Sequence, residues 1–194
     1  MANTYASPGI FPGDKDQGIC AAKGCHLTPV KSGSLPIIIH IAALGLALRA
    51  AGAGRTVFIG QFAKGREYSE LKSLRKISQI AVEQFGRSCF VRKAPTSADF
   101  ACARKGFERI QEIIRTHSHN VIILDEINIA VHLKLLELKE MVAFLERVPD
   151  NVEVVLTGRH AHPAIIKIAD LVSTIQEKKH YLRRGIRARR GIEF

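Results

Sequence analysis

An acidic pair, Asp125-Glu126, follows a continuous apolar run at residues 121–124. The pattern has the form of a Walker B element, in which a carboxylate at the end of a buried strand holds Mg²⁺ directly or through water beside phosphate groups. An acidic pair that begins a helix after an ordinary strand has the same form. Taken alone, the pair favours a magnesium-phosphate site and a helix start about equally.

A second candidate, Arg159, follows Thr157-Gly158 at the end of another predicted strand, residues 153–156. A guanidinium at a strand end can stabilise negative charge on a departing phosphate chain, because it presents several N–H donors. An arginine considered by itself is more often part of a surface ion pair. The assignment of Arg159 therefore depends on its neighbours.

The phosphate-binding loop that a nucleotide enzyme of this layout requires is absent. Such a loop has the pattern GxxxxGK[ST] between the first strand and the first helix, and its backbone N–H groups and lysine cradle phosphates. Residues 32–41 read SGSLPIIIHI and hold neither lysine nor threonine. Instead, Ile37-Ile38-Ile39 predicts a buried strand that joins the following helix near His40. Motifs alone do not predict ATP binding.

The cysteines and histidines form no strong metal or nucleophile pattern. The cysteines are Cys20, Cys25, Cys89 and Cys102, and two H-x-H pairs are formed by His117 with His119 and by His160 with His162. One C-x4-C pair is a weak zinc signal, and the histidine pairs are better explained as solvated loop residues. Free thiols without a disulfide framework or a convincing signal peptide predict a cytoplasmic protein.

Composition favours one globular domain with anionic partners. The chain has 194 residues, of which 46% are hydrophobic and 24% charged, so it can bury one sizeable core. Residues 1–34 lack a sustained apolar period and predict a loose tail, and residues 35–194 are expected to form a single domain. The formal net charge of +11 attracts nucleic acids, membrane surfaces and phosphorylated small molecules alike.

Two of these partners are disfavoured by local sequence. The basic cluster at residues 183–190 has no interleaved aromatic residues, which proteins that stack on bases require. The apolar stretch at residues 35–48 is interrupted by His40 and is shorter than the roughly 20 residues that span a bilayer. We therefore expect neither nucleic-acid nor membrane binding.

The elements that must position the acidic pair and the arginine alternate between strands and helices. Strands are predicted at residues 56–60, 81–85, 120–124 and 153–156, and helices at 42–51, 70–76, 95–116 and 138–147. In the helix at 95–116 the apolar face is predicted to be Phe100, Ala103, Phe107, Ile110 and Ile114. This alternation is typical of an α/β fold with a doubly wound, mostly parallel sheet.

Polar groups follow three of the predicted strands, and they should converge on one crevice. Parallel sheets bind ligands beyond the carboxyl ends of their strands. The groups are Gln61 with Lys64, Asp125 with Glu126, and Thr157 with Arg159.

Several segments together resemble the ATP:corrinoid adenosyltransferase family. The segments are residues 42–50 (AALGLALRA), 60–65 (GQFAKG), 82–86 (VEQFG) with Cys89-Phe90, 124–128 (LDEIN), 155–159 (VLTGR), and Lys179-His180 leading to 191–194 (GIEF). The resemblance covers roughly residues 42–194. It implies a P-loop NTPase-like, RecA-like three-layer sandwich that forms a homodimer and receives electrons from a flavodoxin-type or other reductase.

The activity implied by the resemblance is transfer of the 5′-deoxyadenosyl group of ATP to Co(I) of a reduced corrinoid, with release of triphosphate, in adenosylcobalamin synthesis or salvage. Glu126 and Arg159 would carry catalysis, and Glu126, with Asp125 beside it, would serve Mg²⁺. The residues implied to line the ATP and corrinoid site are Gln61, Lys64, Asn128 and Phe90, of which Phe90 faces the corrinoid.

The chain departs from this family before Ala42. The family has a glycine-rich loop there, and Ile39 and His40 occupy the places of its second lysine and first threonine. Bulky side chains also obstruct the close backbone approach that glycine permits, so we expect ATP affinity much weaker than the family norm. Two explanations stay open: a divergent, non-catalytic corrinoid-binding relative that has lost its phosphate loop, or a shifted reading frame before Ala42.

Overall fold

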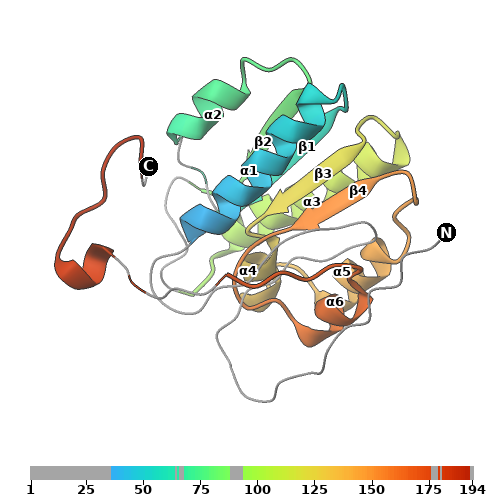
Figure 1. Ribbon diagram of the computed structural model, residues 1–194. Helices are drawn as coiled ribbons and strands as arrows, with labels where there is room; N and C mark the ends of the chain where they lie inside the picture. The colour runs from blue at the N-terminus through green and yellow to red at the C-terminus, as the bar shows by residue number, and fades with distance from the viewer. Residues whose placement is uncertain are drawn as a thin grey trace.

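A four-stranded parallel β-sheet forms the centre of the molecule (Figure 1). The computed structural model describes residues 36–63, 65, 68–87, 94–175, 179 and 181–192. The strands are β1 (Val57–Phe62), β2 (Ile80–Phe85), β3 (Val121–Asp125) and β4 (Glu153–Leu156), in the spatial order β2-β1-β3-β4. The helices are α1 (Pro36–Gly52), α2 (Ser69–Leu74), α3 (Ser97–Arg115), α4 (Ile127–His132), α5 (Leu138–Leu145), α6 (Pro163–Ile168) and the 3₁₀ helix η1 (Tyr181–Arg184).

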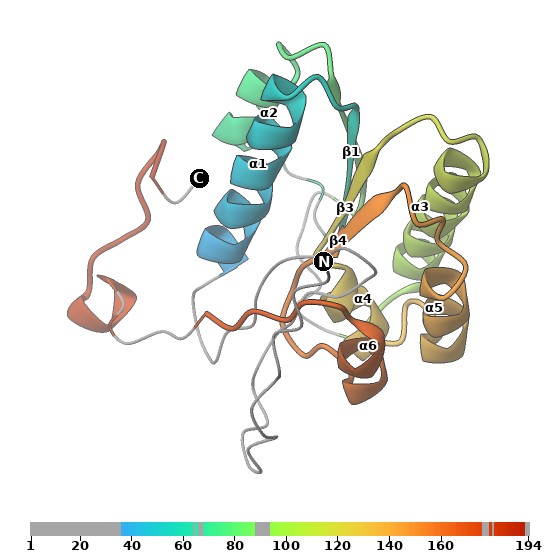
Figure 2. The ribbon, with the colours of Figure 1, turned by 45° about the vertical axis from the view of Figure 1, so that its right-hand side comes forward.

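Helices cover both faces of the sheet, which confirms the expected α/β class and its three layers. On one side α1 packs against β1 and β3, and α2 packs against β2. On the other side α3 packs against β1 and β2, and α5 lies beside α3 (Figure 2). Parallel neighbours require crossover connections, and here the connecting helices supply the two outer layers.

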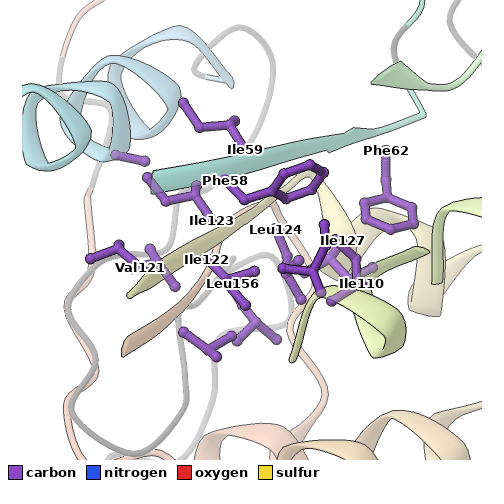
Figure 3. Close-up of a cluster of buried hydrophobic side chains, with 14 of the residues drawn as sticks. Phe58, Ile59, Phe62, Ile110, Val121, Ile122, Ile123, Leu124, Ile127 and Leu156 are labelled. Carbon is purple, nitrogen blue, oxygen red and sulfur yellow. The ribbon is translucent and has the colours of Figure 1, made fainter. Parts of the chain in front are cut away.

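The central strands are buried on both faces because helices lie above and below them. Every residue of β1 and of β3 is buried, and the same holds for three of the four residues of β4. Continuous apolar runs of this kind are expected where a parallel strand has no solvent face. Figure 3 shows Phe58, Ile59, Ile123 and Leu124 in the centre of this core, with Phe62 beside Ile127 at its edge.

The predicted strand at residues 37–39 is wrong, because these residues belong to α1. This helix begins at Pro36, and proline suits the first turn of a helix because the missing N–H has no intrahelical partner there. Farther along, Ala43, Ala47 and Ala50 are buried at helical spacing against the sheet. His40 is buried one turn earlier on the same face. Packing of this face therefore overrides the strand preference of the three β-branched isoleucines.

The long predicted helix at residues 95–116 is confirmed as α3, but its buried face is shifted at both ends. Phe100 is 43% exposed, and Ile113 rather than Ile114 is fully buried. Gly106 lies in the buried face, where an added Cβ would come within 2.4 Å of Cγ of Phe85. The close approach of α3 to β2 at Gly106 decides which residues face the sheet.

Of the short helices α4, α6 and η1, only α4 was anticipated, as the helix start that the pair Asp125-Glu126 left open. They contain 6, 6 and 4 residues, which is too few turns for an apolar period to be recognised. Within the part of the chain that the structure describes, no helix combines the length and apolarity that crossing a bilayer demands.

Asp99, the third residue of α3, forms a capping box with the N-cap residue Thr96, and we expect its replacement by asparagine to lower stability at neutral pH by up to about 1 kcal/mol. Its Oδ2 accepts hydrogen bonds from the backbone N–H of Thr96 at 2.9 Å and from the Thr96 hydroxyl at 2.6 Å. These bonds hold the pKa of Asp99 below its usual value. The stabilisation is therefore present above the pKa of the unfolded chain and is lost as the pH falls through the folded-state pKa.

Urea unfolding of wild type and Asp99→Asn between neutral and strongly acidic pH measures this difference. Glu108→Gln is the control, because Glu108 is exposed in the middle of the same helix. A difference between wild type and Asp99→Asn that does not shrink on acidification would contradict the assignment of the cap.

Candidate active site at the carboxyl ends of the strands

Four polar side chains from four strands form one row across the carboxyl edge of the sheet. Gln61 on β1 is in register with Gln84 on β2 and with Asp125 on β3. Thr157 follows Leu156, the partner of Leu124, and so stands beside Asp125. The convergence of these strand ends that the sequence predicts is therefore observed.

Hydrogen bonds connect the whole row. Gln84 Nε2 donates to Gln61 Oε1 at 3.0 Å, and Gln61 Nε2 donates to Asp125 Oδ2 at 3.3 Å. From the other side, the Thr157 hydroxyl donates to Asp125 Oδ1 at 2.7 Å. Gln61, Asp125 and Thr157 are at most 1% exposed. Because buried polar groups are costly unless hydrogen-bonded, each member of the row fixes the orientation of its neighbours.

Glu126 begins a tight turn between β3 and α4. Its φ is 59°, in the left-handed region, and it is only 3% exposed. The turn is held to the end of β4, because the Glu126 N–H donates to Thr157 Oγ1 at 3.0 Å and the Asn128 N–H donates to the Thr157 carbonyl at 3.2 Å. Left-handed backbone at a non-glycine residue is a strained conformation that surrounding contacts must maintain. Here Thr157 provides those contacts.

Gly158 lets the two strand ends approach each other. Its φ is +119°, a conformation that side chains rarely allow, and an added Cβ would lie 3.2 Å from Cα of Glu126 and 3.3 Å from Glu126 Oε2. Asn128 Nδ2 also donates to the Gly158 carbonyl at 3.4 Å. The segment Thr157-Gly158 therefore packs directly on the Glu126 turn. Arg159 is the next residue after this segment.

Arg159 carries a donor for which the described part of the chain offers no acceptor. Its Nε atom is buried and has no hydrogen-bond partner among the described residues. A buried N–H of a charged group without an acceptor is costly, and an anionic ligand oxygen would satisfy it. The arginine is therefore suited to an anion beside Glu126 rather than to a surface ion pair.

His40 and Glu70 extend the row, although sequence patterns do not single them out as site residues. His40 comes from α1 and lies between two carboxylates: Nδ1 is 2.9 Å from Asp125 Oδ2, and Nε2 is 2.9 Å from Glu70 Oε1 on α2. A histidine inside an otherwise apolar stretch was the available signal, but its partners are 85 and 30 residues away in the chain.

The donor set suits Mg²⁺, which binds oxygen ligands and in nucleotide enzymes is held by one or two carboxylates together with substrate phosphates. Among the described residues, no cluster of three or more histidine, cysteine or acidic side chains could hold a metal by itself. Both oxygens of Asp125 already accept hydrogen bonds, from Thr157 and from Gln61. A magnesium ion here would thus depend on Glu126 and on oxygens of the substrate.

Some predicted site residues lie outside the described part of the chain. These are Lys64, which was expected beside Gln61, and Phe90, which was expected to face a corrinoid. Of the four cysteines only Cys102 is described, as a half-buried free thiol.

The described histidines differ in part from the expected solvated loop residues. His160 stacks on His132, with ring centroids 4.2 Å apart, and His119 packs edge-on against Phe58. Burial lowers the pKa of His119. These three rings thus contribute to packing.

A parallel sheet with helices on both faces and a polar, partly charged row at its carboxyl edge defines an α/β protein of the P-loop NTPase-like class. The chain belongs to the ATP:corrinoid adenosyltransferase family BtuR/CobO/CobP, whose model matches residues 40–194. The family resemblance of the sequence is thereby confirmed.

Similar proteins carry the same description. A corrinoid adenosyltransferase of Sinorhizobium sp is 43% identical over 97 residues, which cover 50% of this chain and 45% of that protein. A corrinoid adenosyltransferase of Pseudomonas aeruginosa is 30% identical over 154 residues, covering 78% of this chain and 76% of that protein. One of Escherichia coli K12 is 29% identical over 153 residues, covering 79% and 78%. The match thus spans less than half of the Sinorhizobium relative.

Proposed function

We propose that this protein transfers the 5′-deoxyadenosyl group of ATP to the cobalt of a reduced corrinoid. Family membership supports the proposal, and the observation that carries it is the buried Nε of Arg159, which has no hydrogen-bond partner among the described residues and belongs to the residue after Gly158, at the Glu126 turn. A buried guanidinium N–H without an acceptor in the described part of the chain is suited to a phosphate chain with its divalent ion.

In this reaction the electron pair of Co(I) forms a bond to C5′ of the ribose while the bond from C5′ to O5′ breaks. Triphosphate leaves with the bonding pair, and the cobalt is formally oxidised to an alkyl-Co(III) product. The protein must hold nucleophile and C5′ in line and stabilise the departing negative charge. Bound Mg²⁺ would neutralise part of that charge.

The chain's own residues would share these tasks along the strand ends. Arg159 would donate to the triphosphate, and Glu126 would hold the magnesium ion. Asp125, whose oxygens accept from Thr157 and Gln61, would orient the row rather than bind the metal directly. Asn128, held to Gly158, would line the same site, and Lys64 and Phe90, which lie outside the described residues, would complete the ATP and corrinoid surfaces.

Family membership also underlies three accompanying proposals: a homodimeric assembly, a cytoplasmic location, and a flavodoxin-type or other reductase as the source of electrons. None of them depends on the geometry of the strand-end row.

A second candidate function is corrinoid binding without adenosyl transfer. It is favoured by α1, which begins at Pro36 and so places helix where the family has its phosphate loop. Helical backbone has its N–H groups bonded internally after the first turn and cannot cradle a phosphate chain along its length.

Calorimetric titration with MgATP, followed by a spectrophotometric assay of adenosylcobalamin formation from chemically reduced cobalamin, separates the two functions. We expect weak binding, with a dissociation constant above the micromolar range, and slow transfer. Arg159→Gln should weaken MgATP binding by about tenfold or more, because it removes a charged donor. Arg104→Gln is the matched control, since Arg104 pairs with Glu140 on the surface of α3.

Each outcome assigns the function. Transfer that depends on Arg159 supports the enzyme, and corrinoid binding without transfer or MgATP binding supports the second candidate. Tight micromolar binding of ATP would contradict the expectation that residues 37–41 impair the phosphate site.

A further inference from the structure

His40 is a buried histidine held between two acidic side chains from different layers of the fold. It is 5% exposed, and it projects from α1 toward the carboxyl edge of the sheet. One ring nitrogen lies 2.9 Å from Asp125 Oδ2 and the other lies 2.9 Å from Glu70 Oε1. The side chains of His40 and Asp125 are 6% and 2% exposed, and that of Glu70 is 22% exposed. Little water screens the contacts of this ring.

The two carboxylate contacts bear on which ring nitrogens of His40 carry a hydrogen. Carboxylate oxygens only accept hydrogen bonds. An unprotonated ring nitrogen at this distance would therefore direct its lone pair at a negatively charged oxygen, which is unfavourable. The Glu70 contact has hydrogen-bond geometry, whereas the Asp125 contact is close but is not a hydrogen bond by its geometry. A ring that joins both carboxylates must carry a hydrogen on each nitrogen, and a buried ring charged in this way would be paired on both sides.

The contacts of His40 affect the site through Asp125, which is linked to Glu126. Asp125 is held on Oδ1 by the Thr157 hydroxyl, and the same Thr157 oxygen accepts the backbone N–H of Glu126. Whatever fixes the Asp125 carboxylate thus also fixes the left-handed turn that presents Glu126.

We propose that His40 is a positioning residue, which ties Asp125 to Glu70 and thereby holds the turn at Glu126 in place. Its effect on catalysis rests on the proposed function. The link itself is a property of the chain alone and is measurable without substrate.

The first measurement is NMR of the intact protein labelled with ¹⁵N in its histidines. At neutral pH we expect both ring nitrogens of His40 to carry hydrogens, with the assignment made by His40→Gln. One bare ring nitrogen in His40 would overturn the proposal, because the ring would then not join the two carboxylates.

The second measurement uses Glu70, which contacts His40 and belongs to none of the strand ends. Glu70→Met removes the acceptor for Nε2, and we expect kcat to fall by about tenfold while KM for ATP stays nearly constant. Glu70→Gln keeps an acceptor oxygen and should restore most of the rate. Glu140→Met is the matched control, because Glu140 is a partly exposed carboxylate that pairs with Arg104 on the surface. It should leave kcat unchanged.

These variants keep the test decisive even if His40→Gln does not fold. A kcat of Glu70→Met equal to that of Glu140→Met in an active protein would overturn the positioning role. If wild type shows no adenosyl transfer at all, the proposed function fails, and the NMR measurement still decides whether His40 joins Asp125 to Glu70.

Discussion

Replacement of Glu126 by glutamine is expected to lower the rate of adenosyl transfer by about a hundredfold, comparable to the loss of one preorganised electrostatic group in other active sites. The substitution keeps the size of the side chain and leaves the backbone bond from residue 126 to Thr157 intact. Only the negative charge is removed, and with it the carboxylate proposed to hold Mg²⁺ against the departing triphosphate.

Single-turnover transfer from ATP to chemically reduced cobalamin measures this effect, with the Mg²⁺ concentration varied. Glu140→Gln is the control for removal of a carboxylate, since Glu140 lies on α5 and pairs with Arg104. A Glu126→Gln protein that transfers within twofold of the wild-type rate would show that this carboxylate takes no part in the reaction. A wild type without transfer would reject the proposed function instead.

Thr157→Val is expected to destabilise the fold by about 2–4 kcal/mol, because two buried polar groups lose their partner at once. The Thr157 hydroxyl donates to Asp125 Oδ1 at 2.7 Å and accepts from the Glu126 N–H at 3.0 Å, and the residue is 1% exposed. Valine has nearly the same shape, so packing is retained. The loss therefore measures the hydrogen bonds rather than a cavity.

Urea unfolding compares Thr157→Val with Thr56→Val. Thr56 also makes a side-chain hydrogen bond, to Asn120 Oδ1 at 3.1 Å, but it is exposed at the opposite end of the sheet, where water replaces a lost partner. We expect its substitution to cost less than about 1 kcal/mol. Equal losses in the two variants would show that burial of the strand-end row contributes nothing special to stability.

The two predictions test the same group of contacts, which joins Thr157, Asp125 and Glu126. Thr157 joins the carboxylate of Asp125 to the backbone of Glu126, so its loss should disturb both stability and transfer. Glu126→Gln should disturb transfer alone. If the results differ in this way, Thr157 has a structural role, and the neighbouring Glu126 carboxylate has a chemical one.

Residue patterns along the chain were sufficient to predict the alternation of strands and helices, and with it the parallel sheet and the approximate place of the site. Buried strands such as β1 and β3 consist mainly of apolar residues, because helices cover both of their faces. Polar residues directly after such runs, among them Gln61 and Asp125, must then meet at one edge.

The arrangement of side chains at that edge depends on tertiary packing and could not be predicted from residue patterns. Residues 37–39 have strand-forming side chains, yet they are helical in α1, because the face that continues through Ala43 and Ala47 packs on the sheet. The contact of His40 with Asp125 joins groups 85 residues apart. Local propensity and spacing carry no information about such a pair, because it forms only when α1 and β3 are brought together by the burial of apolar surface.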